Sequence, residues 1–257
     1  MRIQERDKKI LEYIYTFQCL NSNQNAKLFF NKSLKLTQRR LRILCKAGYL
    51  QRVPIPSIKL GKSPYLYYLG NESASLLNVP VSKPRFTLQL THQQKNTDIM
   101  IEIILSFKSA NIQCEVLPEH LIRISKEENI LIPDGSFVLI KKNKHALFFL
   151  ENCSGTEIIK SPSLNKDIEA KIINYVEMFK NNNIQFYETY FGCSFNRFRM
   201  LFIANNAQRL SAISNIVKDN DSSGFIWLTT LSQFMKHGVD GNIWYVPVHD
   251  KINLSII

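Results

Sequence analysis

The sequence contains few cysteines, and they form no pattern that would support a disulfide framework or a zinc site. Its five cysteines are odd in number, scattered and never spaced as CxxC pairs, so most are expected to be small buried hydrophobic residues. Only nine glycines are present, and none belongs to a phosphate-binding loop, a nucleotide fingerprint or a nucleophile elbow. These absences argue against a metabolic enzyme and indicate no cofactor-binding residues.

Long apolar runs are also missing. No stretch approaches about 18 uncharged apolar residues, the length that a membrane-spanning helix requires. The first ten residues, MRIQERDKKI, lack the apolar run of a signal peptide. We therefore expect a soluble, cytoplasmic protein with no membrane partner. Apolar residues still make up 45% of the chain, with 16 Phe and 10 Tyr, which is enough for folded hydrophobic cores.

The surplus positive charge is confined to the first third of the chain. Residues 1–86 contain 16 Lys and Arg against 4 Asp and Glu, whereas the remaining residues contain 17 of each sign. The whole formal charge of +12 therefore belongs to the first segment. A basic segment beside a neutral one predicts two domains, of which the first binds a polyanion.

The basic segment has the pattern of a winged helix. Apolar residues recur at helical spacing over residues 6–17, 22–30 and 34–46, Gly48 ends the third helix, and strands are expected at 49–53 and 65–69. In such a fold the last helix enters the major groove of double-stranded DNA. The expected DNA contacts are Lys35, Gln38, Arg39, Arg40, Arg42 and Lys46 on that helix, with Lys59 and Lys62 at the tip of the wing. A solvated basic face, or a winged helix that binds only protein, would leave the same pattern.

We expect the winged-helix domain over residues 1–70, a short helix and linker over 71–86, and a second domain over 87–257. Helices and strands alternate in the second domain. The pattern predicts helices at 96–110, 164–180, 206–218 and 231–237, and strands at 112–117, 119–125, 134–140, 145–151, 198–204, 225–229 and 243–246. This mixture predicts an α/β domain with a central mixed sheet, so the whole chain is expected to be an α+β protein.

Two acidic residues of the second domain could hold a metal ion. Asp134 enters one strand directly after Pro133, and Glu151 leaves the next strand. A tight turn between these strands would bring both carboxylates to one edge of the sheet. Converging oxygen ligands suit Mg²⁺ or Mn²⁺, which can polarise a scissile phosphate and activate a nucleophile. A Pro-Asp-Gly turn followed by a solvated glutamate would also explain these residues.

The hairpin resembles the PD-(D/E)xK core of the restriction-endonuclease-like fold. In that core a Lys stands two residues after the second acidic residue, whereas Cys153 stands there in this sequence. The resemblance implies Asp134 and Glu151 as catalytic and metal-binding residues and Glu119 as a third carboxylate, with Glu102 as the alternative. Lys171, in the next helix, is the candidate for the missing lysine.

The order of parts resembles the replication-relaxation family of plasmid proteins, which shades into MobC-type mobilisation relaxases, over nearly the full length. The similar segments are Arg39–Leu50, Ser63–Leu69, Leu90–His92 with Asn96, Pro133–Asp134, Phe149–Glu157, Lys171–Tyr175, and Arg199–Ala204 with Arg209. The resemblance implies a protein that processes plasmid DNA at an origin of transfer or replication and has a nuclease-like second domain.

The leading hypothesis is a relaxase-like protein that binds origin DNA through the winged helix and nicks one strand with Mg²⁺ or Mn²⁺. Other relaxosome proteins and a second copy of the chain are the further partners. Tyr175, Tyr187 and Tyr190 leave a tyrosine nucleophile open, although the five dispersed histidines do not form the cluster of HUH-type relaxases. The alternative is a non-catalytic DNA-binding accessory protein or repressor whose second domain dimerises or docks a partner. Cys153 favours that alternative.

Overall fold

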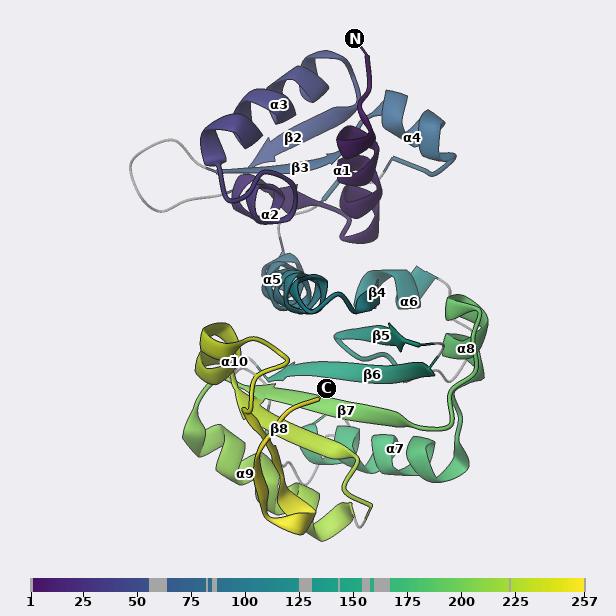
Figure 1. Cartoon of the computed structure of the whole chain (residues 1–257), viewed down its shortest axis with the longest axis vertical. Helices are drawn as coiled ribbons and strands as arrows, with labels where there is room; N and C mark the ends of the chain where they lie inside the picture. Colours follow the sequence, from purple (N-terminus) through teal and green to yellow (C-terminus); the bar gives the residue numbers. More distant parts are fainter. Residues whose placement is uncertain are drawn as a thin grey trace. The chain divides into compact units, whose positions relative to one another are not determined.

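The chain folds into two compact units, residues 1–101 and 102–257, which are drawn in Figure 1. A computed structural model describes residues 2–55, 64–81, 83–84, 87–124, 131–142, 144–153, 158–159, 167–221 and 223–256. Within these ranges, none of the helices combines the length and apolar character needed to cross a membrane.

The first unit is a winged helix, as the sequence predicted. Its helices are α1 (Glu5–Thr16), α2 (Ser22–Phe29) and α3 (Leu34–Lys46), and its strands β1 (Leu20–Asn21), β2 (Leu50–Pro54) and β3 (Tyr65–Leu69) form an antiparallel sheet in the order β1-β3-β2. Gly48 follows α3 with a φ of +79°, a left-handed conformation that glycine adopts without strain. The core is formed by fully buried side chains of α1 and α3: Ile10, Leu11, Ile14, Leu41 and Leu44.

Two further helices extend this unit beyond the wing. The helix α4 (Asn71–Leu77) follows β3, and α5 (Leu88–Ser109) begins earlier than the helix predicted at 96–110. Leu90 of α5 packs against Cys19, Leu66 and Tyr68, and Gln24 of α2 donates a hydrogen bond to Asp98 at 2.9 Å. These contacts place the first half of α5 with the winged helix, so the compact units divide inside α5.

A buried ion pair joins α1 to α3. Asp7 is completely buried, and Arg40 donates Nε to its Oδ1 at 2.8 Å and Nη2 to its Oδ2. Burial opposes the ionisation of Asp7, but hydrogen bonds from Arg40 and from the Gln4 N–H hold the pKa of Asp7 below its ordinary value. Arg40 was predicted to contact DNA; we correct that assignment, because its guanidinium is committed to Asp7.

The second unit is built on a mixed sheet of seven strands, which confirms the predicted fold class. The strand order is β10-β9-β8-β7-β6-β5-β4, with β6, β7 and β8 parallel and the other pairs antiparallel. The strands are β4 (Gln113–Pro118), β5 (Gly135–Lys141), β6 (Lys144–Cys153), β7 (Phe198–Ala204), β8 (Ile226–Thr230), β9 (Trp244–Val246) and β10 (Lys251–Leu254).

Helices cover both faces of this sheet (Figure 1). On one face α7 (Ile168–Asn181) and α9 (Ala207–Asn220) pack on a large core that includes Phe149, Phe198 and Phe202. On the other face, Phe107 of α5 lies 6.2 Å from Phe137 between ring centroids. The sequence did not predict α8 (Gln185–Phe191) or β10, whereas α10 (Leu231–His237) lies where it was predicted.

The strand predicted at 119–125 is wrong, because the structure has the helix α6 (Glu119–Ile124) there. β4 ends at Pro118, which has no N–H to continue a ladder. Directly after it, Glu119 and Arg123 form a 2.6 Å ion pair at the i, i+4 spacing of a helix.

We predict that Arg40→Met destabilises the first unit at neutral pH by about 3 kcal/mol, because it leaves the Asp7 carboxylate buried and unpaired. Hydrogen exchange of the α1 and α3 amides measures this loss. Since the folded-state pKa of Asp7 is depressed, the contribution of the pair is present above the ordinary pKa of 3.8 and disappears as pH falls through the folded value.

Arg39→Met is the matched control, since Arg39 is exposed on the same helix. The double variant Asp7→Leu with Arg40→Met should recover much of the protection, because no buried charge then remains. Equal exchange rates in the wild-type protein and Arg40→Met would contradict a structural role for the pair.

Candidate functional site

Two carboxylates lie side by side where β5 begins and β6 nears its end. Gly135 of β5 pairs with Leu150 of β6 in the antiparallel ladder. The neighbouring residues Asp134 and Glu151 are therefore opposite each other, and their side chains share one face of the sheet. Their exposed fractions are only 8% and 2%. The structure therefore brings together the two acidic residues that the sequence pointed to.

The helix α7 completes the surroundings of Glu151. Asp167 caps this helix by accepting the Ala170 N–H at 2.8 Å, and the i, i+4 spacing places Lys171 and Tyr175 on one helix face. Lys171 donates Nζ to Glu151 Oε2 at 2.8 Å, and the Tyr175 hydroxyl donates to Oε1 at 2.8 Å. Lys171, predicted to act from the following helix, thus reaches the carboxylate pair.

The electrostatics of Glu151 are unfavourable to its charge. Burial, and secondly the negative charge of Asp134, raise the pKa of Glu151 to about 7, although Lys171 and Tyr175 act in the opposite direction. Burial and the neighbouring Glu151 also raise the pKa of Tyr175 well above its ordinary value. Tyr175 therefore stays protonated and serves as a hydrogen-bond donor.

Within the hairpin, Asn152 holds Asp134 in place, and Cys153 lies in the hydrophobic core. Asp134 Oδ2 accepts the backbone N–H of Asn152 at 2.8 Å, which holds its carboxylate beside β6. Cys153 is 1% exposed and belongs to the hydrophobic core under α7 and α9. It cannot supply the positive charge of the usual lysine, and among the described residues Lys171 is the cation that contacts Glu151.

Glu119 and Glu102 are held elsewhere. The Glu119 carboxylate pairs with Arg123 on its own helix, and Glu102 belongs to α5, which packs on the opposite sheet face from α7. In the ranges that the structure describes, no group of three or more His, Cys, Asp or Glu could hold a metal ion. Ser154–Glu157, which the family resemblance includes, lies outside those ranges.

Two of the three candidate tyrosine nucleophiles are buried. Tyr175 and Tyr187 are at most 1% exposed, and the Tyr187 hydroxyl donates to the Leu131 carbonyl at 3.1 Å. Burial raises the pKa of Tyr187 above its ordinary value. Tyr190 on α8 is 45% exposed.

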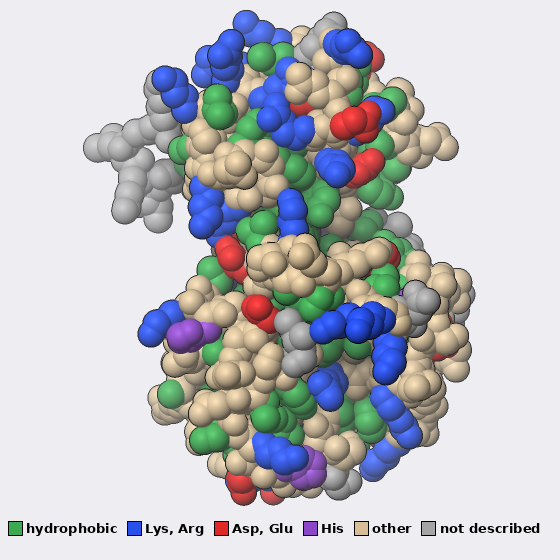
Figure 2. Space-filling model, in the orientation of Figure 1, with side chains coloured by type: hydrophobic (Ala, Val, Ile, Leu, Met, Phe, Trp, Pro, Cys, Tyr) green, Lys and Arg blue, Asp and Glu red, His purple; other side chains and the backbone are tan. Residues whose placement is uncertain are grey.

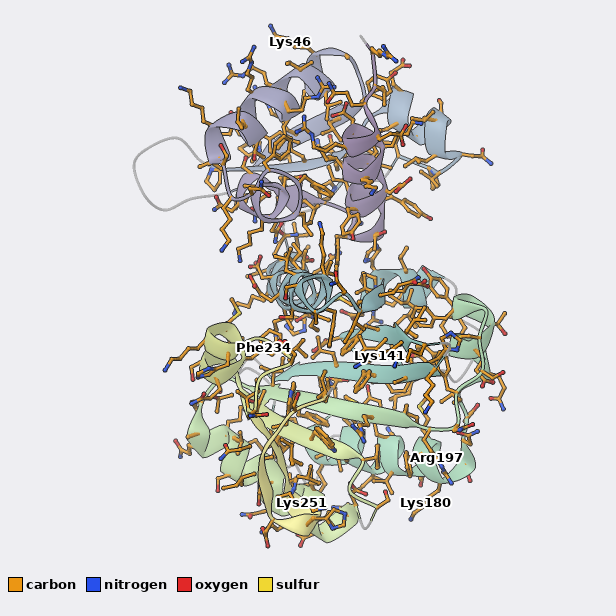
Figure 3. All side chains as sticks on the ribbon, viewed as in Figure 1. Lys46, Lys141, Lys180, Arg197, Phe234 and Lys251 are labelled. Atoms are coloured by element: carbon orange, nitrogen blue, oxygen red, sulfur yellow. The ribbon has the colours of Figure 1, made fainter. Side chains whose placement is uncertain are left out.

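The outer face of α3 carries the DNA contacts that were predicted on this helix, except Arg40. The exposed polar and charged side chains on this helix are Lys35, Gln38, Arg39, Arg42 and Lys46, and Leu34 and Leu36 are exposed there as well. Figure 2 shows Lys and Arg side chains gathered over α3, and Lys46 points away from the unit in Figure 3. Lys59 and Lys62, predicted at the wing tip, lie outside the described residues.

A cleft beside α3 adds an arginine that the sequence did not single out. The cleft is lined by α2, α3, β2 and β3, and its polar lining includes Asn23, Gln38, Arg42 and Arg52. The Arg52 guanidinium stacks 4.4 Å from the ring centroid of Tyr65, which orders it at low entropic cost. Gln51 and Arg52 are both exposed in β2, so this short strand has no alternating pattern that would have singled out Arg52 in the sequence.

Comparisons with known proteins point to one family. The family model described as Replication-relaxation matches residues 11–190. A search of the curated proteins finds no match. Among solved structures, the restriction endonuclease FokI bound to DNA is similar at 12% identity and a TM-score of 0.33, over 91% of this chain and 44% of that one. FokI without DNA is similar at 12% identity and a TM-score of 0.33, over 93% of this chain and 45% of that one. The chain spans less than half the length of these structures.

We predict that Glu151→Gln flattens the pH dependence of the second unit's stability. With a folded-state pKa of about 7 against the ordinary 4.5, folded Glu151 keeps a proton that the unfolded chain releases. The free energy of unfolding therefore falls as pH rises from about 4.5 to 7, by on the order of 1–3 kcal/mol. The glutamine variant should lose that fall.

Urea unfolding in EDTA, followed by tryptophan fluorescence, measures this effect in the right unit because Trp227 and Trp244 both belong to it. Asp134→Asn should shrink the fall partially, since it removes the neighbouring negative charge. An unchanged pH slope in Glu151→Gln would show that another group titrates.

Proposed function

The chain belongs to the replication-relaxation family, and from this membership we propose that it processes plasmid DNA. The first unit binds double-stranded DNA at an origin, and the second unit nicks one strand in a reaction that requires Mg²⁺ or Mn²⁺. The observation that carries the catalytic part is the convergence of Asp134, Glu151 and Lys171 on one sheet face.

The carboxylate pair fits a divalent cation. Asp134 and Glu151 are adjacent oxygen donors, and the charge of Asp134 helps to raise the pKa of Glu151 even with Lys171 beside it, so a further cation would relieve the repulsion between the two carboxylates. Mg²⁺ is commonly held by only one or two carboxylates, with water and substrate phosphate completing its shell. When bound, the ion would stabilise negative charge on the scissile phosphate.

The surrounding residues position these groups. Tyr175 holds Oε1 of Glu151 and leaves the carboxylate in a fixed orientation. Lys171 donates to Oε2 and has 30% of its side chain exposed, so its ammonium can also contact a phosphate oxygen. Asn152 fixes Asp134 through its backbone N–H. In the proposed hydrolysis, the water oxygen bonds to phosphorus, the bond between phosphorus and the leaving ester oxygen breaks, and that oxygen takes up a proton in place of the one that water loses.

The first unit supplies binding. Gln38, Arg39 and Arg42 lie on the exposed face of α3, where arginine can read a guanine edge with two hydrogen bonds and glutamine an adenine edge. Lys35, Lys46 and Arg52 flank this face and suit phosphate contacts, which position a protein on DNA. The proposed partner is the origin duplex; other relaxosome proteins and a second copy of the chain stay predictions.

A second function is favoured by one observation. Cys153 is buried where the nuclease core usually has its lysine. The alternative is therefore a DNA-binding accessory protein or repressor whose second unit docks a partner and does not cleave DNA. The nicking experiment below separates the two functions.

We predict that Arg39→Gln and Arg42→Gln each weaken specific binding by about 1–3 kcal/mol and relax specificity at one base pair, because each removes a bidentate base contact. Duplexes selected by the wild-type protein from a random-sequence library are the probe, and fluorescence anisotropy gives the affinity. Lys9→Gln, which removes an exposed charge from α1, is the control. Full affinity in both arginine variants would refute the role of α3.

We predict that the wild-type protein converts a supercoiled plasmid carrying the selected site to open circles in Mg²⁺ or Mn²⁺. Asp134→Asn and Glu151→Gln should abolish this conversion and retain DNA affinity, because both residues lie in the other unit from α3. Tyr175→Phe should only slow it, since Glu151 keeps its bond to Lys171. Gel electrophoresis of a time course measures the nicking rate.

A wild-type protein that binds the site and leaves the plasmid supercoiled in both metals would support the accessory function. Nicking that survives Asp134→Asn would place the chemistry elsewhere in the chain.

A further inference from the structure

The second unit is neutral in its summed charge, but its charges are not evenly distributed. β5 ends with Lys141 and β6 begins with Lys144, while Arg197 and Arg199 stand at the start of β7, next to β6 in the sheet. These residues lie at the opposite end of the strands from Glu151. At about 3.3 Å per residue along β6, the separation from Lys144 is roughly 20 Å.

A cleft occupies this end of the sheet. Its rim carries the side chains of Lys144, His145, Ser194, Asn196, Arg197, Arg199 and Ser223, all exposed, and its floor is apolar. Figure 2 shows Lys and Arg side chains on this side of the unit that contains β4–β10. In Figure 3, Lys141, Lys180 and Arg197 lie toward the same end of the sheet.

The two arginines are ordered by aromatic rings. The Arg197 guanidinium lies 4.9 Å from the ring centroid of Phe179 and donates to the Phe179 carbonyl at 3.1 Å. The Arg199 guanidinium lies 4.3 Å from the Trp227 ring. A stacked guanidinium has lost most of its rotamer freedom before a ligand arrives, which lowers the entropic cost of binding an anion.

Among the residues that the structure describes, no carboxylate pairs with these cations. Within the described residues, Lys141, Lys144, Arg197 and Arg199 form no ion pair. Glu188 and Asp221 are close in sequence to the lining, but each accepts backbone N–H groups: Glu188 from Phe195, and Asp221 from Ser223 and Gly224. The described part of the cleft therefore keeps a positive charge that no ion pair compensates.

We propose that this cleft binds the phosphate backbone of double-stranded DNA, independently of base sequence. Arginine and lysine beside serine and asparagine is the set of side chains that contacts phosphate and sugar in protein–DNA interfaces. The aromatic rings of the floor are already covered: Phe148, Phe198 and Phe225 are at most 4% exposed, and the half-buried Phe179 stacks on Phe225 and lies under the Arg197 guanidinium. That feature favours a paired duplex over a single strand, whose bases stack on aromatic side chains.

The inference concerns a surface apart from α3 and from the carboxylates, so it stands without the nicking reaction. It rests on the proposed function only in taking DNA as the polyanion. A duplex held there would be anchored about six base pairs from the carboxylates, at 3.4 Å per base pair.

The test uses the full chain and a random-sequence 40-bp duplex. The cleft variant combines Lys144→Gln, Arg197→Gln and Arg199→Gln. The control variant combines Lys108→Gln, Lys236→Gln and Lys251→Gln, three exposed lysines of the same unit that do not line the cleft. Each triple change is also made in an Arg39→Gln, Arg42→Gln background, which removes the proposed reading residues of α3.

We expect the cleft variant to bind the duplex about tenfold more weakly in both backgrounds and to reduce the slope of log affinity against log salt by about 2–3, since each lost phosphate contact removes roughly 0.9. The control variant should match its parent. Arg197→Lys with Arg199→Lys should keep most of the affinity because the charge remains. Tryptophan-monitored unfolding verifies that the cleft variant is folded.

The proposal is overturned if the cleft variant binds like its parent, or if the control variant loses as much affinity. It is also overturned if the cleft variant binds the duplex like its parent and loses affinity only for a single strand of equal length. A loss of specific binding from the α3 substitutions alone would leave the proposed function standing and this inference refuted. If instead the cleft variant loses affinity and the α3 substitutions do not, the inference about the cleft stands and the assignment of DNA reading to α3 is refuted.

Discussion

The candidate chemistry depends on the register between β5 and β6. Pairing of Gly135 with Leu150 sets Asp134 beside Glu151, and a slip of one residue would turn one of the two carboxylates to the other sheet face. Packing on both faces fixes this register. Phe137 stacks on Phe148 with 4.8 Å between ring centroids on one face, while Val138 and Leu147 enter the core on the other.

Burial then makes the carboxylate pair dependent on α7. An ionised glutamate beside an aspartate in a closed core is costly, which is why the pKa of Glu151 is raised. Lys171 and Tyr175 offset it because α7 presents both on one face. The same helix therefore covers the hydrophobic core and shapes the polar site, so the stability of the unit and the geometry of the site are linked.

The basic residues of the chain have different uses that net charge does not distinguish. Arg40, Arg123 and Lys171 are held in internal ion pairs. Others stack on aromatic rings and keep their charge available, as Arg52 does on Tyr65 and Arg199 on Trp227. A unit whose charges sum to zero can still present a positive cleft when its carboxylates lie elsewhere or accept backbone N–H groups.

Local pattern was enough to predict the three helices of the winged helix, Gly48 after α3 and the hairpin that pairs Asp134 with Glu151, because helical period, turn chemistry and hairpin register act over a few residues. It did not decide what Arg40 contacts, since Asp7 is 33 positions away. Nor did it distinguish α6 from a strand, because six residues with two adjacent apolar side chains fit either period. Those outcomes, and the contact between Lys171 and Glu151 across 20 positions, depend on packing between segments that are distant in the sequence. A pattern read over a few neighbouring residues does not include the energies of such contacts.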